Sequence, residues 1–229
     1  MKLLALDTST EFLSLALQLD DNVLTHHQQV GATASQLILP QIQALLASAE
    51  MTLHDLDGIA FGAGPGAFTG VRIACGVAQG LAFGANLPVV GVNTLLALAQ
   101  ASGQAKVIAC LDARMGEIYH AAFVFADGDW QEVGLTTVCK PQLAPSVTGS
   151  NWVGVGSGWA AYGEVLTTLY AQNTANVMSN ITPTATAILN LALATFLAGK
   201  GKPASAAAPI YVRNRVALTT QERAEGLRL

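Results

Sequence analysis

Residues 62–72 read Gly-Ala-Gly-Pro-Gly-Ala-Phe-Thr-Gly-Val-Arg and connect one apolar segment, 58–61, to another, 71–84. Glycine permits positive φ angles and lets another backbone or a ligand approach closely. Free amides at the start of a helix also favour an anion, so a phosphate-binding loop is the first hypothesis. The Walker phosphate loop requires a lysine after its last glycine, but no lysine occurs between Leu3 and Ala105.

The dinucleotide-binding pattern is not met either. Only its looser form is matched, by Gly62, Gly64 and Ala67, and Pro65 lies inside the turn. We interpret the glycines as allowing a sharp strand-to-helix turn and close packing, which position helix 71–84 for a partner.

On both sides of this turn, strand-like segments alternate with helix-like ones. The predicted strands are 2–6, 12–19, 23–30, 58–61 and 88–92, and the predicted helices are 35–49, 71–84 and 94–101. Pro40 predicts a kink or a restart in the first helix. Three antiparallel strands followed by alternating units predict an α/β fold with a mixed sheet flanked by helices. This is the order of an actin-like ATPase or ribonuclease H-like half-domain.

A second half begins at Lys106. Strand 107–111 ends in Asp112 and is followed by strand 117–125, just as strand 2–6 ends in Asp7 before the next strand. The two halves therefore predict a weak internal repeat. We expect two subdomains, residues 1–104 and a smaller one at 105–229, with the C-terminal tail packing back on the first.

The composition points to a covered apolar surface. Of 229 residues, 11% are charged and 52% are hydrophobic, against about 25% and 45–50% in typical globular domains. No apolar run of 18 residues lacks charges, glycine, proline and polar breaks, and the N-terminus has no signal-peptide features. We therefore expect a cytoplasmic chain, away from membranes, with part of its surface covered by a partner.

The charges argue against nucleic-acid binding by this chain alone. Its net charge is −4, and nucleic-acid binding requires a basic face. Arginines cluster only at the C-terminus, and whether Arg213 or Arg215 contacts RNA stays open. The four histidines show no metal-ligand spacing, so no metal site is expected.

Helix 71–84 is apolar on every side, which predicts burial on more than one side. Gly76, Gly80 and Gly84 form a smooth strip that lets another helix approach closely. Glycine costs a helix about 1 kcal/mol relative to alanine, so packing contacts must offset it. We predict a helical partner interface made by Ile38, Ile42, Leu45, Val71, Ala74, Val77, Ala78 and Leu81.

Two turns could hold a nucleotide. Asp7, Thr8 and Thr10 resemble the first phosphate turn of actin-like ATPases, although the usual glycine is missing and the aspartate could instead cap its own turn. Gly156 and Gly158 follow a strand where such folds hold adenosine, or they simply allow close packing. Near the expected cleft, Asp112, Arg114 and Glu117 could form a polar site or a structural ion pair.

Five segments together resemble the bacterial TsaB (YeaZ) family over nearly the whole chain. They are residues 4–10, 64–72, 78–82, 112–119 and 209–213. The resemblance implies an actin-like fold in two subdomains and a non-catalytic role in placing threonylcarbamoyl on N6 of adenosine 37, in tRNAs that read codons beginning with A. The implied partners are the paralogous transferase TsaD, in a heterodimer, and the ATPase TsaE, with tRNA contacted indirectly.

The resemblance also explains what is missing. TsaD-like proteins carry two metal-binding histidines in a segment that here reads 91–98, where Thr94 and Leu98 take the two places. Neither side chain suits iron or zinc, so the chain is interpreted as a catalytically inactive paralogue with no cofactor of its own. ATP or ADP at the partner interface and a homodimer of the isolated chain are further expectations. Ala34 departs from relatives that have histidine there, and its effect is not predicted.

Two other functions remain as alternatives. A free-standing actin-like ATPase or phosphotransferase would use Asp7 and the turn at 153–158. A peptidase is the weaker one, because no nucleophile or metal signature is present in the sequence.

Overall fold

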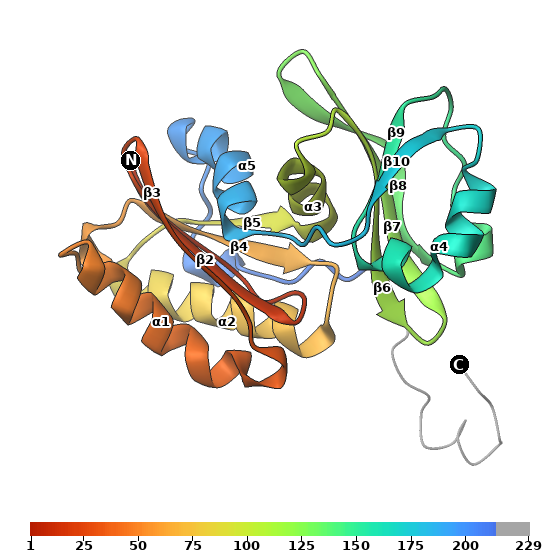
Figure 1. Ribbon diagram of the computed structural model, residues 1–229. Coiled ribbons are helices and arrows are strands. Elements are labelled where there is room, and N and C mark those ends of the chain that lie inside the picture. The colour runs from red at the N-terminus through yellow and green to blue at the C-terminus, as the bar shows by residue number, and fades with distance from the viewer. Residues whose placement is uncertain (214–229) are drawn as a thin grey trace.

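The computed structural model describes residues 1–213 and contains two five-stranded sheets (Figure 1). The first sheet holds β1 (Lys2–Asp7), β2 (Phe12–Leu19), β3 (Asn22–Gln29), β4 (Gly58–Gly64) and β5 (Val89–Asn93). The second holds β6 (Lys106–Arg114), β7 (Glu117–Ala126), β8 (Asp129–Cys139), β9 (Trp152–Val155) and β10 (Thr174–Met178). The helices are α1 (Ala34–Ser48), α2 (Phe68–Ala85), α3 (Thr94–Ser102), α4 (Ser157–Leu169) and α5 (Ala185–Leu197).

The first sheet is mixed, as predicted. Its order is β3-β2-β1-β4-β5, with antiparallel pairs among β1, β2 and β3 and parallel pairs from β1 to β4 and from β4 to β5. Successive residues of a strand point to opposite faces. Leu4 and Leu6 therefore pack in one cluster with α1 and α2, while Leu3 and Ala5 pack in another with α5.

The second sheet repeats the topology of the first. Its order is β8-β7-β6-β9-β10, again with three antiparallel strands followed by two parallel ones. The internal repeat predicted from Asp7 and Asp112 is confirmed, because these residues lie near the ends of the equivalent strands β1 and β6. The turn from β4 to α2 likewise corresponds to the turn from β9 to α4.

The layers run from α1 and α2 through the first sheet to α3 and α5, then through the second sheet to α4 (Figure 1). α3 is shared by the two halves, since Leu95 and Leu98 pack against the second sheet and Ala97 against the first. The expected boundary at 104/105 falls between α3 and β6. α5 returns to the first sheet, so the first unit also includes residues from the end of the chain.

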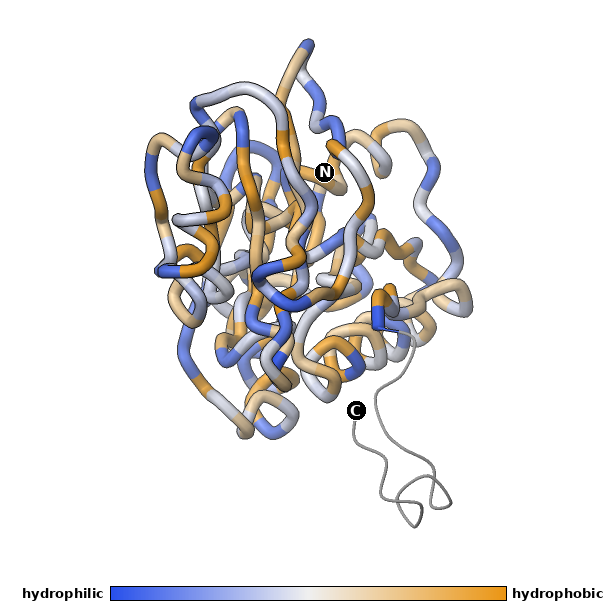
Figure 2. The backbone as a smooth tube through the Cα atoms, turned by 90° about the vertical axis from the view of Figure 1, so that its right-hand side faces the viewer, coloured by the Kyte–Doolittle hydropathy of each residue, from blue (hydrophilic) through white to orange (hydrophobic). Residues whose placement is uncertain are grey.

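The first two helices, α1 and α2, contain the proline and the long apolar stretch noted in the sequence. α1 is one continuous helix through Pro40, so there is no restart, and Pro40 lies on the exposed side. Among the helices of residues 1–213, α2 alone is long and apolar enough to cross a membrane. α2 packs on β4 and β1, which accounts for the apolar residues on its inward face. In Figure 2, hydrophilic residues gather at the outer turns and hydrophobic segments run through the inner strands.

Candidate functional site

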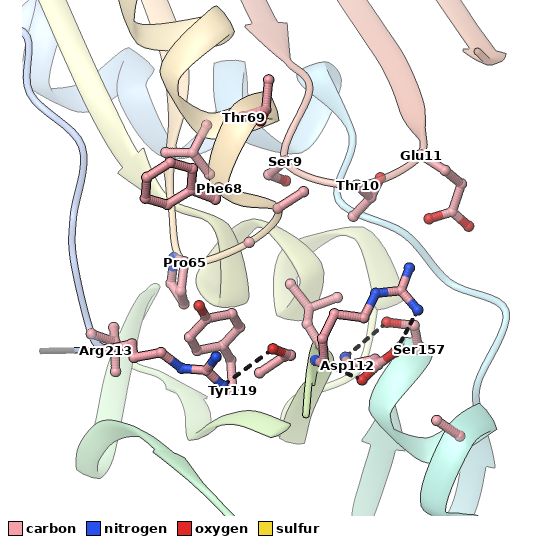
Figure 3. Close-up of a pocket in the computed structure, with 18 of the residues that line it drawn as sticks. Ser9, Thr10, Glu11, Pro65, Phe68, Thr69, Asp112, Tyr119, Ser157 and Arg213 are labelled. Atoms are coloured by element: carbon pink, nitrogen blue, oxygen red, sulfur yellow. Dashed lines mark hydrogen bonds and ion pairs between the residues drawn. The ribbon is translucent and has the colours of Figure 1, made fainter. Parts of the chain in front are cut away.

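A cleft of about 1120 Å³ lies between the two sheets, where the equivalent turns of both halves meet (Figure 3). The first half contributes the turn after β1, with Ser9, Thr10 and Glu11, and the glycine-rich turn from Pro65 to Thr69. The second half contributes the end of β6 and the start of α4, and residues 210–213 close one side. This is the place where the sequence predicted a nucleotide or a polar site.

The glycines of residues 62–70 are required by the turn after β1. A Cβ on Gly62 would strike the carboxylate of Asp7, and one on Gly70 would strike the carbonyl oxygen of Thr8. On Gly66 it would lie 2.5 Å from the carbonyl oxygen of Ser9. The amide of Ala67 donates to that same oxygen at 2.7 Å. The glycine-rich backbone therefore occupies the space beside the first turn, which confirms the interpretation as close packing.

The second half uses glycine in the same way. A Cβ on Gly156 would lie 2.5 Å from the carbonyl oxygen of Cys110, and one on Gly158 would lie 2.7 Å from the Cβ of Cys110. Neither glycine lines the cleft. The geometry favours the alternative that these two glycines allow close packing, because the chain's own β6 fills the space next to them.

Asp7 and Thr8 are also engaged within the chain. Both are about 1% exposed. The Asp7 Oδ2 atom accepts from the amide of Ser9 at 3.1 Å and from its hydroxyl at 2.8 Å, and the Thr8 hydroxyl donates to the carbonyl of Gly70 at 2.6 Å. Of the five candidate nucleotide ligands, only Thr10 lines the cleft. The geometry does not present the others to a nucleotide, and the alternative of a self-capping aspartate is the one observed.

The buried carboxylate of Asp7 has unusual electrostatics. Its Oδ1 atom has no hydrogen-bond partner, and burial raises its pKa to about 6, against the opposing effect of the two Ser9 hydrogen bonds. The folded state therefore binds this proton more tightly than the unfolded chain does. The stability that the proton supplies is complete below pH 3.8 and is lost as the pH rises through about 6.

We expect Asp7→Asn to remove this pH dependence. The difference in unfolding free energy between wild type and variant should shift by about 2.5 kcal/mol from pH 4 to pH 8, in favour of the wild type at low pH. Urea unfolding at several pH values measures it. Buried His120, whose pKa is lowered to about 4 by desolvation, titrates alike in both proteins and cancels in the difference. A pH-independent difference contradicts the prediction.

The polar groups of the cleft are mostly held in local pairs. Asp112 Oδ2 forms an ion pair with Arg114 at 3.0 Å, and Asp112 Oδ1 accepts from the Arg114 amide at 2.9 Å. The Ser157 hydroxyl, at the start of α4, accepts from the Asp112 amide at 3.1 Å. The structure favours the ion-pair hypothesis for Asp112 and Arg114.

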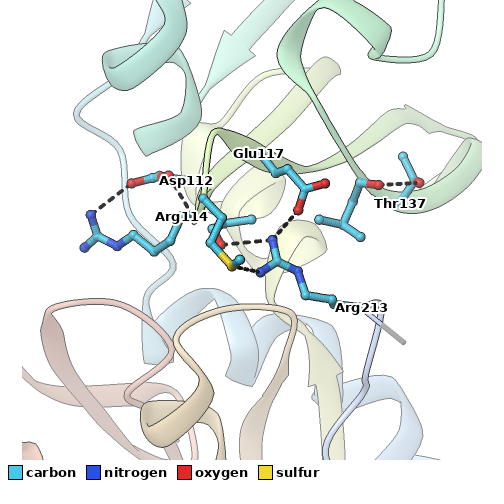
Figure 4. A network of polar contacts seen from close by, with 8 residues as sticks. Asp112, Arg114, Glu117, Thr137 and Arg213 are labelled. Atoms are coloured by element: carbon cyan, nitrogen blue, oxygen red, sulfur yellow. Dashed lines mark hydrogen bonds and ion pairs between the residues drawn. The ribbon is translucent and has the colours of Figure 1, made fainter. Parts of the chain in front are cut away.

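Glu117 has a different partner, which sequence reasoning missed. Its Oε2 atom lies 2.6 Å from the guanidinium of Arg213, which also donates to the carbonyl of Ala113 at 3.2 Å (Figure 4). Both residues belong to the segments that carry the TsaB resemblance, but nothing in either segment indicates that they touch. Arg215 lies outside the described residues.

Six of the eight residues predicted at a partner interface are core residues instead. Ile38, Ile42, Leu45, Val71, Ala74 and Ala78 are buried inside the chain, at most 9% exposed. A helix lying on a sheet turns its most continuous apolar stripe inward, and these residues form that stripe. Val77 and Leu81 are half-buried and pack on the same core.

The outward faces of α1 and α2 carry a different set of residues. Leu39 is 47% and Phe83 is 81% exposed, and a Cβ on Gly76, Gly80 or Gly84 would meet no atom within 4 Å. An apolar groove of about 460 Å³ lies alongside them. It is lined by Leu39, Ile42, Gln43, Leu46, Ala47, Met51, Thr52, Leu53 and Leu81. The glycine spacing in the sequence was the available signal for this face.

Thr94 and Leu98, the positions that the sequence resemblance pairs with metal-binding histidines, hold structural side chains. Thr94 is fully buried, and its hydroxyl oxygen accepts from the amide of Gly64 at 3.0 Å. Leu98 is fully buried in the cluster between α3 and the second sheet. Both positions therefore hold the fold together rather than opening onto the cleft.

The duplicated mixed sheets around a central cleft define a protein of the actin-like, ribonuclease H-like class. The family model of TsaD, tRNA N6-adenosine threonylcarbamoyltransferase, matches residues 27–217. Within this class, the chain belongs to the TsaB family, whose members are described as tRNA threonylcarbamoyladenosine biosynthesis proteins.

The likeness to that family extends over nearly the whole chain. The TsaB protein of Escherichia coli K12 is 38% identical over 228 residues, which cover 95% of this chain and 96% of the relative. The Haemophilus influenzae protein is 38% identical over 94% of this chain and 95% of its own length. YeaZ from Pseudomonas aeruginosa has a similar structure, with a TM-score of 0.85 and 39% identity over 92% of this chain and 99% of that one.

Proposed function

We propose that this chain is a non-catalytic, cytoplasmic subunit of the machinery that transfers threonylcarbamoyl to N6 of adenosine 37 in tRNAs reading codons that begin with A. In this proposal the paralogue TsaD carries out the transfer, this chain activates it as a heterodimeric scaffold, and the ATPase TsaE joins the pair. Membership in a family named for tRNA threonylcarbamoyladenosine biosynthesis supports this function over a free-standing ATPase.

The burial of Thr94 and Leu98 is the observation that supports a non-catalytic role. They occupy the places of the TsaD metal histidines, and each is fully buried, one in a hydrogen bond to Gly64 and the other in a hydrophobic core. Side chains used in this way cannot turn toward a metal without breaking the packing of α3. A partner that supplies the catalytic residues fits this arrangement.

The exposed apolar residues and glycines on the outward face of α1 and α2 support a partner interface at this face. Gly76, Gly80 and Gly84 leave the α2 backbone uncovered, and Phe83 and Leu39 are apolar and exposed beside it. A helix can approach a glycine strip closely enough for backbone contacts. We place TsaD on this face, which an isolated chain would use for a homodimer.

In this proposal, nucleotide and tRNA are bound with the help of the partner and not by this chain alone. Because Asp7, Thr8, Gly156 and Gly158 are engaged in the chain's own packing, we place any ATP or ADP at the boundary with TsaD. The net charge of −4 supports indirect contact with tRNA. The Arg213 side chain is largely buried in its ion pair with Glu117, so we do not assign it to RNA.

A reconstituted transfer assay tests this function. Threonylcarbamoyl-adenylate and unmodified tRNA are incubated with TsaD and TsaE, with and without this chain, and modified adenosine is measured by mass spectrometry. We expect transfer only when both TsaD and this chain are present, and none from this chain alone. The scaffold proposal would be contradicted if the purified chain hydrolysed ATP at an ordinary enzymatic rate and Asp7→Ala abolished that activity.

A further inference from the structure

After α5, residues 201–213 form a strap that runs from the first unit to the second and includes a short 3-10 helix at Ala204–Ala206. Lys202 forms paired backbone hydrogen bonds with Val89 at the edge of the first sheet, at 2.7 and 2.9 Å. The Gln79 side chain donates to the carbonyl of Ala204 at 3.2 Å, and the Ile210 amide donates to the carbonyl of Ala63 at 2.7 Å. The strap is therefore fixed along the first unit up to the glycine-rich turn.

Arg213, the last of the described residues, binds the second unit through its side chain. The guanidinium of Arg213 contacts the Glu117 carboxylate at 2.6 Å, the Ala113 carbonyl at 3.2 Å and the Met115 sulfur at 3.3 Å (Figure 4). These three partners surround the turn between β6 and β7. The pair is partly shielded, since the side chains of Arg213 and Glu117 are 13% and 32% exposed, and a charge-assisted hydrogen bond is stronger than a neutral one.

The β6–β7 turn that Arg213 contacts has a constrained backbone conformation. Arg114, Met115 and Gly116 follow one another with φ angles of +61°, +57° and +74°. Two consecutive non-glycine residues in this region persist only where the surroundings hold them. Arg213 contacts the residue before these three, the middle one and the residue after them.

The other connections between the halves lie around α3. The chain passes from the first sheet to the second through α3 and back through residues 179–184, and α3 itself packs on both sheets. Ala113, Arg114 and residues 210–213 line the cleft. The segment that carries the Arg213 contact therefore lines the cleft, while α3, whose residues do not line it, is the packed link between the two sheets.

We propose that the Arg213–Glu117 pair is a clasp between the two subdomains that sets the opening of the cleft, with α3 as the hinge. With the clasp formed, the strap holds the β6–β7 turn against the glycine-rich turn of the first unit. With the clasp broken, the strap stays on the first sheet and the second sheet rotates away about α3, since hinge motions are absorbed by a few linking residues.

Distance measurement between spin labels tests the clasp. Labels at Ala32→Cys and Glu164→Cys are read by pulsed electron resonance in a Cys139→Ser background. Both positions are exposed and lie within three residues of cleft-lining residues, Gly31 and Ala161. Excess unlabelled chain restricts the signal to distances within one molecule. The variants are Glu117→Gln, which removes the charge at constant size, and Arg213→Met, which keeps the side-chain stem.

Arg114→Met is the matched control, because its ion pair with Asp112 lies in the same turn but within one unit. We expect wild type and Arg114→Met to share one distance, and Glu117→Gln and Arg213→Met to lengthen it by more than about 2 Å, the scale of real domain rearrangements. If Arg213→Met fails to fold, Glu117→Gln alone decides. Distances in Glu117→Gln that match those of Arg114→Met overturn the proposal.

Discussion

Gly70→Ala is expected to unfold or severely destabilise the chain, although it adds one methyl group to a helix. Its Cβ would strike the carbonyl oxygen of Thr8, while the Thr8 hydroxyl is bonded to the carbonyl of Gly70 itself at 2.6 Å. Neither backbone can move without disturbing the turn after β1 or the start of α2. Overpacking of a tight core costs about 1–3 kcal/mol and occasionally more, and we expect about 3 kcal/mol or more here.

Gly76→Ala, on the same helix, is the matched control. A Cβ there meets nothing within 4 Å, so the higher helix propensity of alanine should raise the unfolding free energy by about 0.5–1 kcal/mol. Urea unfolding followed by circular dichroism compares the two variants under one condition. Equal effects of the two substitutions would show that the glycine-rich turn is not packed against Thr8.

Gly80→Leu is expected to weaken the complex with TsaD and to leave the fold intact. Gly80 is exposed on α2 and its Cβ position is open, so leucine should also improve helix propensity. A side chain on the glycine strip holds a docked helix away. At an overpacking cost of about 1–3 kcal/mol, the affinity should fall by roughly 5- to 150-fold. This prediction rests on the proposed function.

Gly163→Leu provides the control for that variant, because it lies on α4 of the second sheet with an equally open Cβ position. Titration calorimetry with TsaD compares the wild type and both variants. Ala78→Glu, which the apolar pattern also suggests, is not a suitable test, since Ala78 is fully buried and a charge there would disrupt the fold. Unchanged affinity in Gly80→Leu would place the interface elsewhere.

Much of the first sheet could be predicted because its signals are local. β2 runs from Phe12 to Leu19 as expected, and the predicted helices of the first half appear within a few residues of their expected ends. α2 begins at Phe68 rather than Val71, because the glycine-rich turn is shorter than its glycines suggest. β8 and β10 are mostly exposed edge strands, and their mixed polarity carries little periodic signal.

The candidate site was only partly predictable. The cleft was expected near Asp7 and Asp112 from the repeat of strand and acidic turn, and the turns that carry these residues meet there. What the acidic side chains contact was not predictable, since Asp7 faces Ser9 and Gly62 under the turn, while Asp112 pairs with Arg114. The local sequence around a strand-end aspartate is the same whether its side chain lies under the turn or pairs with a neighbouring arginine.

The sequence by itself determined the order of the strands and helices in the first half, the duplication, the family and the need for glycine at residues 62–70. The elements and the glycines follow from periodicity and backbone sterics within short segments, and the family follows from the resemblance of five such segments. Only the tertiary structure decided which side of α2 is core and which is free, because a helix that is apolar all round has no inward face until a sheet covers one. It also brought Arg213 to Glu117, 96 residues earlier, since a contact between two distant turns depends on how both sheets pack around α3.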